Sequence, residues 1–255
     1  MTRPSHMKGE AIDDLGAYLN HVSNLVGKWA GSSMVRHADR YWIYRGQRDN
    51  SWPLIPKVDR SDVARYRLAQ HWSREEHEAR LLDQFKKTAR PHLRTQPTDD
   101  WEWLAIGQHH GLATRLLDWT KNPLTALFFA IEEPVRGTES VVWGYLHEGP
   151  SCATYERGPL TSTSLLVFEP PHVSPRIPAQ SGLFTVHPPP EGTEEADWPG
   201  SMLRFCISYG SSWMLRRQLI ASGVHRGALF PDLDGVARDV NRSLSRLEDE
   251  YLETL

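Results

Sequence analysis

Apolar residues recur every three or four positions in several parts of the chain, which predicts amphipathic helices. The first such pattern comprises Ile12, Leu15, Leu19, Val22, Val26 and Trp29. A longer one covers residues 61–85, with Ser61 as its expected N-cap. A third covers residues 99–110, and a fourth begins with Asn122 and Pro123, a favourable cap and first helical position. The first half of the chain is therefore expected to be mainly helical.

Alternating apolar and polar positions predict β-strands mainly in the second half of the chain. An earlier strand over residues 40–45 places Tyr41, Ile43 and Arg45 on one face and Trp42 and Tyr44 on the other. The later strands are expected at residues 141–146, 164–168, 183–187 and 202–207, with helices at 211–221 and 234–252. This order predicts an α+β fold, with a helical N-terminal half around a mixed, mainly antiparallel sheet.

The chain shows no internal repeat, no low-complexity tract and no domain boundary. Residues 10–255 are therefore expected to form one domain, which is well within the usual size of a domain. Residues 1–9 are polar and are expected to be disordered. Residues 188–199 are rich in proline and acidic side chains, so we expect an exposed loop there.

Composition and charge narrow the class of protein. Hydrophobic residues make up 39% and charged residues 24%, as in ordinary globular proteins. The net charge of −3 lacks the basic excess of proteins that bind nucleic acid through its phosphates, so no strong nucleic-acid footprint is expected. The longest clearly apolar run, residues 127–131, is too short to span a membrane. Cys152 and Cys206 form no CxxC pair, which favours a reducing compartment over a disulfide. A cytoplasmic protein without a membrane partner or signal peptide is expected.

The triplet Tyr44-Arg45-Gly46 at the end of the first strand is the first candidate for chemistry. An arginine at a strand end presents a planar fork of donors that suits a phosphate or diphosphate. A following glycine lets a ligand approach the backbone closely. The alternative is that Arg45 pairs with an internal carboxylate such as Asp118.

Residues 108–120 are dense in polar and aromatic side chains and lie between two predicted helices. Loops of this kind often face a ligand. Thr114, Arg115, Asp118 and Thr120 are candidates for binding ribose hydroxyls or phosphate, and His110 for acid–base chemistry. The alternative is a buried polar network in which Arg115 pairs with Asp118.

The sequence gives little reason to expect a metal. His109 and His110 are adjacent, so on a helix their side chains point about 100° apart and form a poor pair of ligands. Asp232 and Asp234 could bind a divalent ion or act as a base, but aspartates in this position are more often helix N-caps.

Three of these segments, in this order, resemble the FRG family, which is named after its (Phe/Tyr)-Arg-Gly motif. They are Tyr44-Arg45-Gly46, the block 108–130 and the block 229–235; Trp52-Pro53-Leu54, 175–177 and 179–185 are also similar. The resemblance covers about residues 38–240. It implies a setting in prokaryotic conflict systems, such as anti-phage defence or toxins.

The chain also resembles, more weakly, ADP-ribosyltransferases of the Arg-Ser-Glu class. Tyr44-Arg45-Gly46 looks like their first element, 114–120 followed by 126–130 like their second, and Gln180 stands where their glutamate falls. This resemblance implies an ADP-ribosyltransferase-like fold and NAD as substrate, with no metal.

The second resemblance also implies roles for individual residues. Arg45 would hold the diphosphate, while Trp119 and Thr114 or Thr120 would orient the nicotinamide ribose. Asp118 would stabilise positive charge, and His110 would help to position a protein or nucleic-acid acceptor.

The chain departs from that class at two points. The Ser-Thr-Ser triplet is absent from the second element, and residues 161–164 come too late to replace it. Gln180 can donate and accept hydrogen bonds but carries no negative charge, so another acid, with Asp118 the first choice, would have to serve. Two alternatives stay open: a metal-dependent nucleotide or RNA hydrolase using His110, Asp118, Asp232 and Asp234, and a non-catalytic ligand sensor or protein-interaction module.

Overall fold

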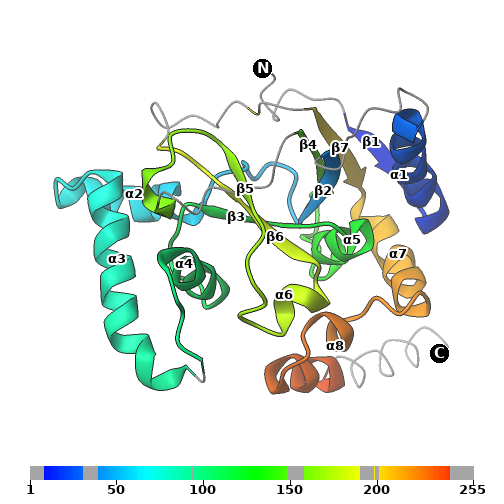
Figure 1. Ribbon diagram of the computed structural model, residues 1–255. Coiled ribbons are helices and arrows are strands. Elements are labelled where there is room, and N and C mark those ends of the chain that lie inside the picture. The colour runs from blue at the N-terminus through cyan, green and yellow to red at the C-terminus, as the bar shows by residue number, and fades with distance from the viewer. Residues whose placement is uncertain are drawn as a thin grey trace.

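The computed structural model describes residues 9–30, 40–93, 95–148, 158–189, 198 and 201–241, with side chains omitted for 26–30. A seven-stranded sheet lies at the centre, in the order β1-β7-β4-β2-β3-β6-β5 (Figure 1). The strands are β1 (Glu10–Ile12), β2 (Arg40–Gln47), β3 (Leu116–Thr120), β4 (Ser140–Glu148), β5 (Leu166–Phe168), β6 (Gly182–Val186) and β7 (Met202–Ile207). β1 runs parallel to β7, and the other neighbouring pairs are antiparallel. The predicted α+β class with a mixed, mainly antiparallel sheet is confirmed.

Helices α3 and α4 lie beside β3, β6 and β5, helices α1 and α7 lie toward β1 and β7, and α5 packs across β2 and β4 (Figure 1). The α-helices are α1 (Leu15–Ala30), α2 (Ser61–Ala69), α3 (Arg74–Ala89), α4 (Asp100–His109), α5 (Pro123–Ile131), α6 (Arg176–Ala179), α7 (Tyr209–Ala221) and α8 (Arg226–Leu229). Short 3-10 turns occur at η2 (Lys57–Asp59), η3 (Arg90–His92) and η4 (Pro159–Thr161). Residues 233–241 are also helical.

The two faces of β2 enter different hydrophobic cores, as its alternation predicts. Tyr44 and Trp42 pack with α1, α5 and α7, whereas Ile43 and Tyr41 face the opposite core of Trp119, Trp143, Tyr145 and Trp198. A third core joins α3 and α4 to β3, β5 and β6. Trp198 is fully buried, so the expectation of an exposed loop over 188–199 is wrong at this residue. Residues 190–197 and 199 lie outside the described part.

The single helix predicted over 61–85 is two helices. α2 ends at Ala69, His71 takes a left-handed backbone with φ of 56°, and α3 begins at Arg74. Ser73 and Glu76 form a capping box, in which each side chain satisfies the other's backbone amide. A capping box starts a new helix even where apolar spacing continues across it, which is why the prediction is wrong.

Residues 116–120 form β3, not the loop that the sequence indicates. β3 pairs with β6 from Leu116 opposite Val186 to Thr120 opposite Gly182. Likewise Ile12 ends β1 instead of starting a helix, and Asp14 accepts a hydrogen bond from the Ala17 amide at the start of α1. Both strands are short and carry polar residues, so apolar alternation alone does not reveal them.

The other predicted elements are found close to their expected positions, including α4 behind its Asp99 cap and α5 behind Asn122. Of the helix predicted over 234–252, residues 242–252 lie outside the described part, as do residues 1–8 of the predicted disordered N-terminus. Among the described residues, no helix is both long and apolar enough to cross a membrane.

Candidate functional site

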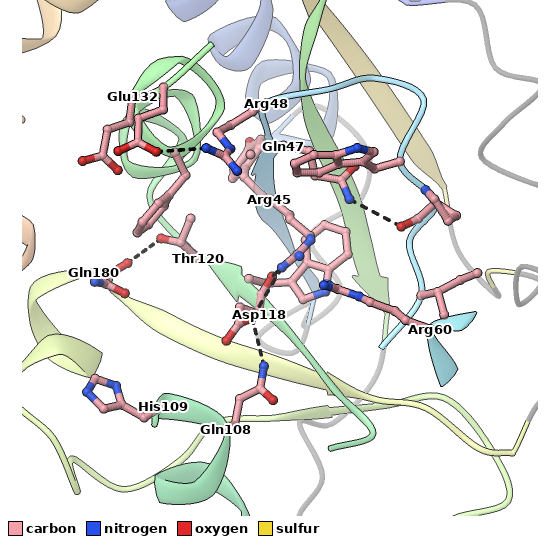
Figure 2. A pocket seen from close by; sticks show the side chains of 18 of the residues that line it. Arg45, Gln47, Arg48, Arg60, Gln108, His109, Asp118, Thr120, Glu132 and Gln180 are labelled. Carbon is pink, nitrogen blue, oxygen red and sulfur yellow. Dashed lines mark hydrogen bonds and ion pairs between the residues drawn. The ribbon is translucent and has the colours of Figure 1, made fainter. Parts of the chain in front are cut away.

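A cavity of about 1040 Å³ lies beside the ends of β2 and β3. Its walls come from the β2 end, the loop and α2 start at 52–64, the α4 end, β3, the α5 end, α6 and the segment after α8 (Figure 2). β2 pairs with β3 at one position, Tyr44 opposite Thr120. Next to that position, the Arg45 side chain of β2 donates a hydrogen bond to the Asp118 carbonyl oxygen of β3.

Arg45 lines the cavity at the end of β2. Its Nη1 donates to the Asp118 carbonyl oxygen at 2.7 Å and lies 3.6 Å from Asp118 Oδ2. Its Nε is buried without a hydrogen-bond partner in the described structure. Burial lowers the pKa of Arg45, the Asp118 carboxylate opposes this shift, and Arg60 adds to it. Arg45 is therefore a desolvated cation whose single carboxylate partner is itself open to the cavity.

Asp118 presents its carboxylate to the cavity, with 59% of its side chain exposed. Gln108 Nε2 donates to Asp118 Oδ2 at 3.0 Å, and Gln108 Oε1 accepts from Thr114 Oγ1 at 2.6 Å. Gln108 thus orients the acid, and Thr114 fixes which way the Gln108 amide points. The sequence reasoning missed Gln108, although it stands first in the polar block 108–120.

Thr120 and Gln180 connect β3 to the far wall of the cavity (Figure 2). Thr120 Oγ1 donates to the Gln180 carbonyl at 2.6 Å and accepts from the Asn122 amide. Gln180 Nε2 donates to the Leu229 carbonyl at 3.0 Å. Both residues line the cavity, as the resemblance implies, and both also hold its wall together.

Arg115 does not reach the cavity, so its predicted role in ligand binding needs correction. Its side chain is fully buried and forms a forked pair with Glu78, with the shortest N–O distance 2.7 Å. Thr114 is also buried and acts through Gln108. The predicted alternative of an Arg115–Asp118 pair is not found either, because Arg45 is the partner of Asp118.

Tyr44 and Trp119 border the cavity, but their side chains belong to the cores. Burial raises the pKa of Tyr44 to about 12, and Trp119 Nε1 donates to Thr185 Oγ1 at 2.9 Å. A Cβ on Gly46 would lie 2.0 Å from the Ala126 carbonyl oxygen. Gly46 therefore makes room for α5 against β2, and its expected role of admitting a ligand is corrected.

His109, not His110, faces the cavity. α4 ends at His109, and His110 follows as an exposed C-cap. His109 Nε2 lies 3.4 Å from Ser174 Oγ. Burial and the nearby Arg176 guanidinium lower the pKa of His109. The predicted role of His110 is therefore corrected, since the imidazole that can meet a ligand is that of its neighbour.

The segment after α8 closes one side of the cavity. Phe230 lies under the Arg176 guanidinium, whose Nε is bonded to Asp232. Asp232 also accepts from the Gly235 amide at 2.8 Å, and these two hydrogen bonds lower its pKa to about 2. This matches the favoured reading of Asp232 as a cap. Asp234 is exposed and does not line the cavity.

Arg48 and Arg60 were missed by the sequence reasoning. Arg48 Nη1 pairs with Glu133 at 2.9 Å and its guanidinium lies over the Trp52 ring. Arg60, just before α2, extends into the cavity toward Arg45 (Figure 2). Neither arginine stands in a recognisable motif, and only the fold brings them to the site. Within the described ranges, no group of three or more His, Cys, Asp or Glu side chains could hold a metal ion.

Comparison with protein families identifies one match. The model described as FRG domain matches residues 40–139, which include Arg45, Gln108 and Asp118. Neither the curated proteins nor the solved structures provide a match. The predicted resemblance to the FRG family is confirmed over residues 40–139.

Proposed function

We propose that the cavity binds NAD or a closely related nucleotide and cleaves its nicotinamide–ribose bond, as an ADP-ribosyltransferase or NAD glycohydrolase. The observation that carries the proposal is the juxtaposition of the Arg45 guanidinium and the Asp118 carboxylate, 3.6 Å apart in one cavity. A diphosphate needs a fixed cation, and a ribose that develops positive charge needs an anion close by.

The size and walls of the cavity suit a dinucleotide. Its volume of about 1040 Å³ is at the upper end of small-molecule sites. Trp52, with Arg48 over its ring, provides one aromatic wall. Phe129 and Phe230, in edge contact, provide another. Two aromatic walls and several arginines in one cavity match a ligand that carries planar rings at both ends of a diphosphate.

In the proposed reaction, the bond between ribose C1′ and the nicotinamide nitrogen breaks. Both electrons of the bond leave with nicotinamide, which departs as a neutral molecule. The ribose becomes an oxocarbenium ion, which the Asp118 carboxylate stabilises. Water, or a nucleophile of a protein or nucleic-acid acceptor, then forms the new bond to C1′ and releases its proton to Asp118.

Asp118 is the best placed of the acids that line the cavity. Asp59, Glu132 and Glu133 are each paired with an arginine, namely Arg74, Arg226 and Arg48. Asp62, in the first turn of α2, also lines the cavity, but the carboxylate that lies beside Arg45 is that of Asp118. Asp118 is more exposed than its partner Arg45 and is oriented by Gln108. This placement supports Asp118 as the acid that replaces the charge absent from Gln180.

The proposal is tested by measuring NAD loss and nicotinamide release by mass spectrometry. We expect turnover by the wild type and a fall of about 10²- to 10³-fold for Arg45→Ala and for the isosteric Asp118→Asn. The matched control is Arg136→Ala, an exposed arginine outside the cavity, which should retain wild-type activity.

Calorimetry with NAD separates the remaining outcomes. Binding without turnover, lost in Arg45→Ala, would identify a ligand sensor and overturn the catalytic part of the proposal. A folded wild type that neither binds nor consumes NAD would overturn the whole proposal. The setting in anti-phage defence or a toxin system follows from the family resemblance and remains a proposal.

A further inference from the structure

We propose that Arg60 and Arg45 together form a diphosphate subsite, so that the cavity selects nucleoside diphosphates over nucleosides and monophosphates. This inference deepens the proposed function by assigning recognition of the diphosphate to a second arginine. It rests on the arginines and carboxylates that line the cavity, on the position of Arg60 at the start of α2, and on the contacts that anchor the start of α2.

The first observation is the convergence of two guanidinium groups in one cavity. Arg60 reaches from the start of α2 toward Arg45, which comes from β2 (Figure 2). The two cations are close enough that Arg60 contributes to lowering the pKa of Arg45. Two guanidinium groups that face the same space repel each other, and an anion bound between them relieves that repulsion.

The second observation is the distribution of counter-ions around the cavity. Arg48 pairs with Glu133, and Arg176 pairs with Asp232. The Asp118 carboxylate lies 3.6 Å from the Arg45 guanidinium. Arg60 has no ion-pair partner among the described residues, so its charge is available to a ligand.

The backbone beside Arg60 adds to the same positive field. Arg60 is the N-cap of the nine-residue helix α2, and its side chain caps no amide. Ser61, Asp62 and Ala64 line the cavity, so the first turn of α2 faces it. The first amides of a helix lack intrahelical acceptors and favour a bound anion. Asp62 opposes this effect, because its carboxylate lies in the same turn.

The position of Arg60 is fixed by its neighbour in the chain. Asp59 is largely buried and lies 2.7 Å from Arg74 and 3.5 Å from Arg67. Arg74 in turn donates to the His187 carbonyl at 3.1 Å. The start of α2 is therefore anchored to α3 and to the end of β6, so that binding orders little more than the Arg60 side chain.

The test compares adenosine, AMP and ADP by calorimetry at constant ionic strength. We expect the wild type to bind ADP more tightly than AMP or adenosine. Arg60→Ala should lose about 10- to 100-fold in ADP affinity, the loss of one charged hydrogen-bonding contact, with adenosine affinity unchanged. Arg65→Ala, an exposed arginine of α2 that does not line the cavity, is the matched control.

Asp62→Asn provides a test in the opposite direction. Removing this carboxylate should tighten ADP binding, because it takes a negative charge away from the diphosphate subsite. Thermal unfolding of each variant checks that α2 is intact. The inference is overturned if Arg60→Ala binds ADP as the wild type does, or if the wild type binds ADP no better than adenosine.

Failure of this inference and failure of the proposed function give different results. NAD turnover by a wild type that does not favour ADP over adenosine would refute the diphosphate subsite and leave the catalytic proposal standing. Loss of ADP affinity in Arg60→Ala, in a protein that does not cleave NAD, would support the subsite and refute catalysis.

Discussion

Gly46 shows how a residue beside the cavity can serve the packing of the fold. It occupies the point where α5 crosses β2, and its Cα hydrogen faces the Ala126 carbonyl. The glycine of the Tyr-Arg-Gly triplet thus allows α5 to approach, and α5 carries Phe129 and the glutamates that follow it to the cavity. The motif combines one residue whose charge lies at the cavity, Arg45, with a tyrosine and a glycine that pack into the fold beside it.

Gly46→Ala is predicted to destabilise the fold by about 3 kcal/mol or more, because the new Cβ would meet backbone atoms at 2.0 and 2.5 Å. Gly158→Ala is the control, since it has open space around its Cβ and a backbone that alanine accepts. The measurement is the midpoint of urea unfolding. A Gly46→Ala protein with the wild-type midpoint would show that α5 does not pack this closely.

At the level of single residues, the sequence identified Arg45, Asp118, Thr120 and Gln180 as site residues, and all four line the cavity. The sequence did not show where the Arg115 side chain lies. In extended backbone, residues three apart such as Arg115 and Asp118 point to opposite faces, whereas in the predicted loop they could pair. Nor could the sequence choose between two adjacent histidines, since that choice depends on where α4 ends.

At the level of elements, a buried ion network connects α3 to the start of β3. Arg115 and Glu78 are both almost fully buried, and Arg74 bonds to Asp59 beside the same pair. Glu78 comes from the densely charged run 74–80, in which Arg74 and Glu78 are buried and paired although charged residues are mostly exposed.

Glu78→Ala is predicted to cost about 3–5 kcal/mol of unfolding free energy, because it leaves the Arg115 guanidinium buried without its partner. The double variant Glu78→Leu/Arg115→Met should be much less destabilised, since it removes both charges and keeps the volume. Chemical denaturation of the two proteins is the measurement. Equal destabilisation would show that packing, not the unpaired charge, accounts for the loss.

At the scale of the whole molecule, the sequence predicted the fold class but not the order of strands. β2 lies between β4 and β3, and β7 pairs with β4 and, in parallel, with β1. These pairings join segments far apart in the chain, so no local pattern encodes them. Arg60 enters the site for the same reason, because the anchoring of Asp59 to Arg74 is a tertiary contact.

At the scale of the whole molecule, the buried His187 makes the folding stability depend on pH. His187 is almost fully buried, and burial, aided by Arg74 and Arg45, lowers its pKa from 6.5 to about 3. Between these values the unfolded chain binds a proton that the folded protein does not. Stability should therefore fall as the pH drops from 6.5 toward 3, by at most about 1.4 kcal/mol per pH unit from this group.

His187→Gln should flatten this slope, whatever its effect on stability at neutral pH. The measurement is the unfolding free energy from pH 4.5 to 7, a range above the window in which Asp232 titrates. His77 and His109 also have lowered pKa values and act in the same sense, so some slope will remain. An unchanged slope in His187→Gln would contradict the prediction, and the exposed His110→Gln is the control.

The single pairing position between β2 and β3 matters for anyone who transplants this domain into another protein. The described residues of 40–139, the range that matches the family, include two strands of the sheet, β2 and β3, which pair at Tyr44 and Thr120. The longer ladders that hold them come from β4 and β6, which lie further along the chain. Residues 40–139, which match the family, are therefore fewer than the residues that build the sheet and the cavity. A unit moved into another protein has to extend at least through β7 and through Phe230, which lines the cavity.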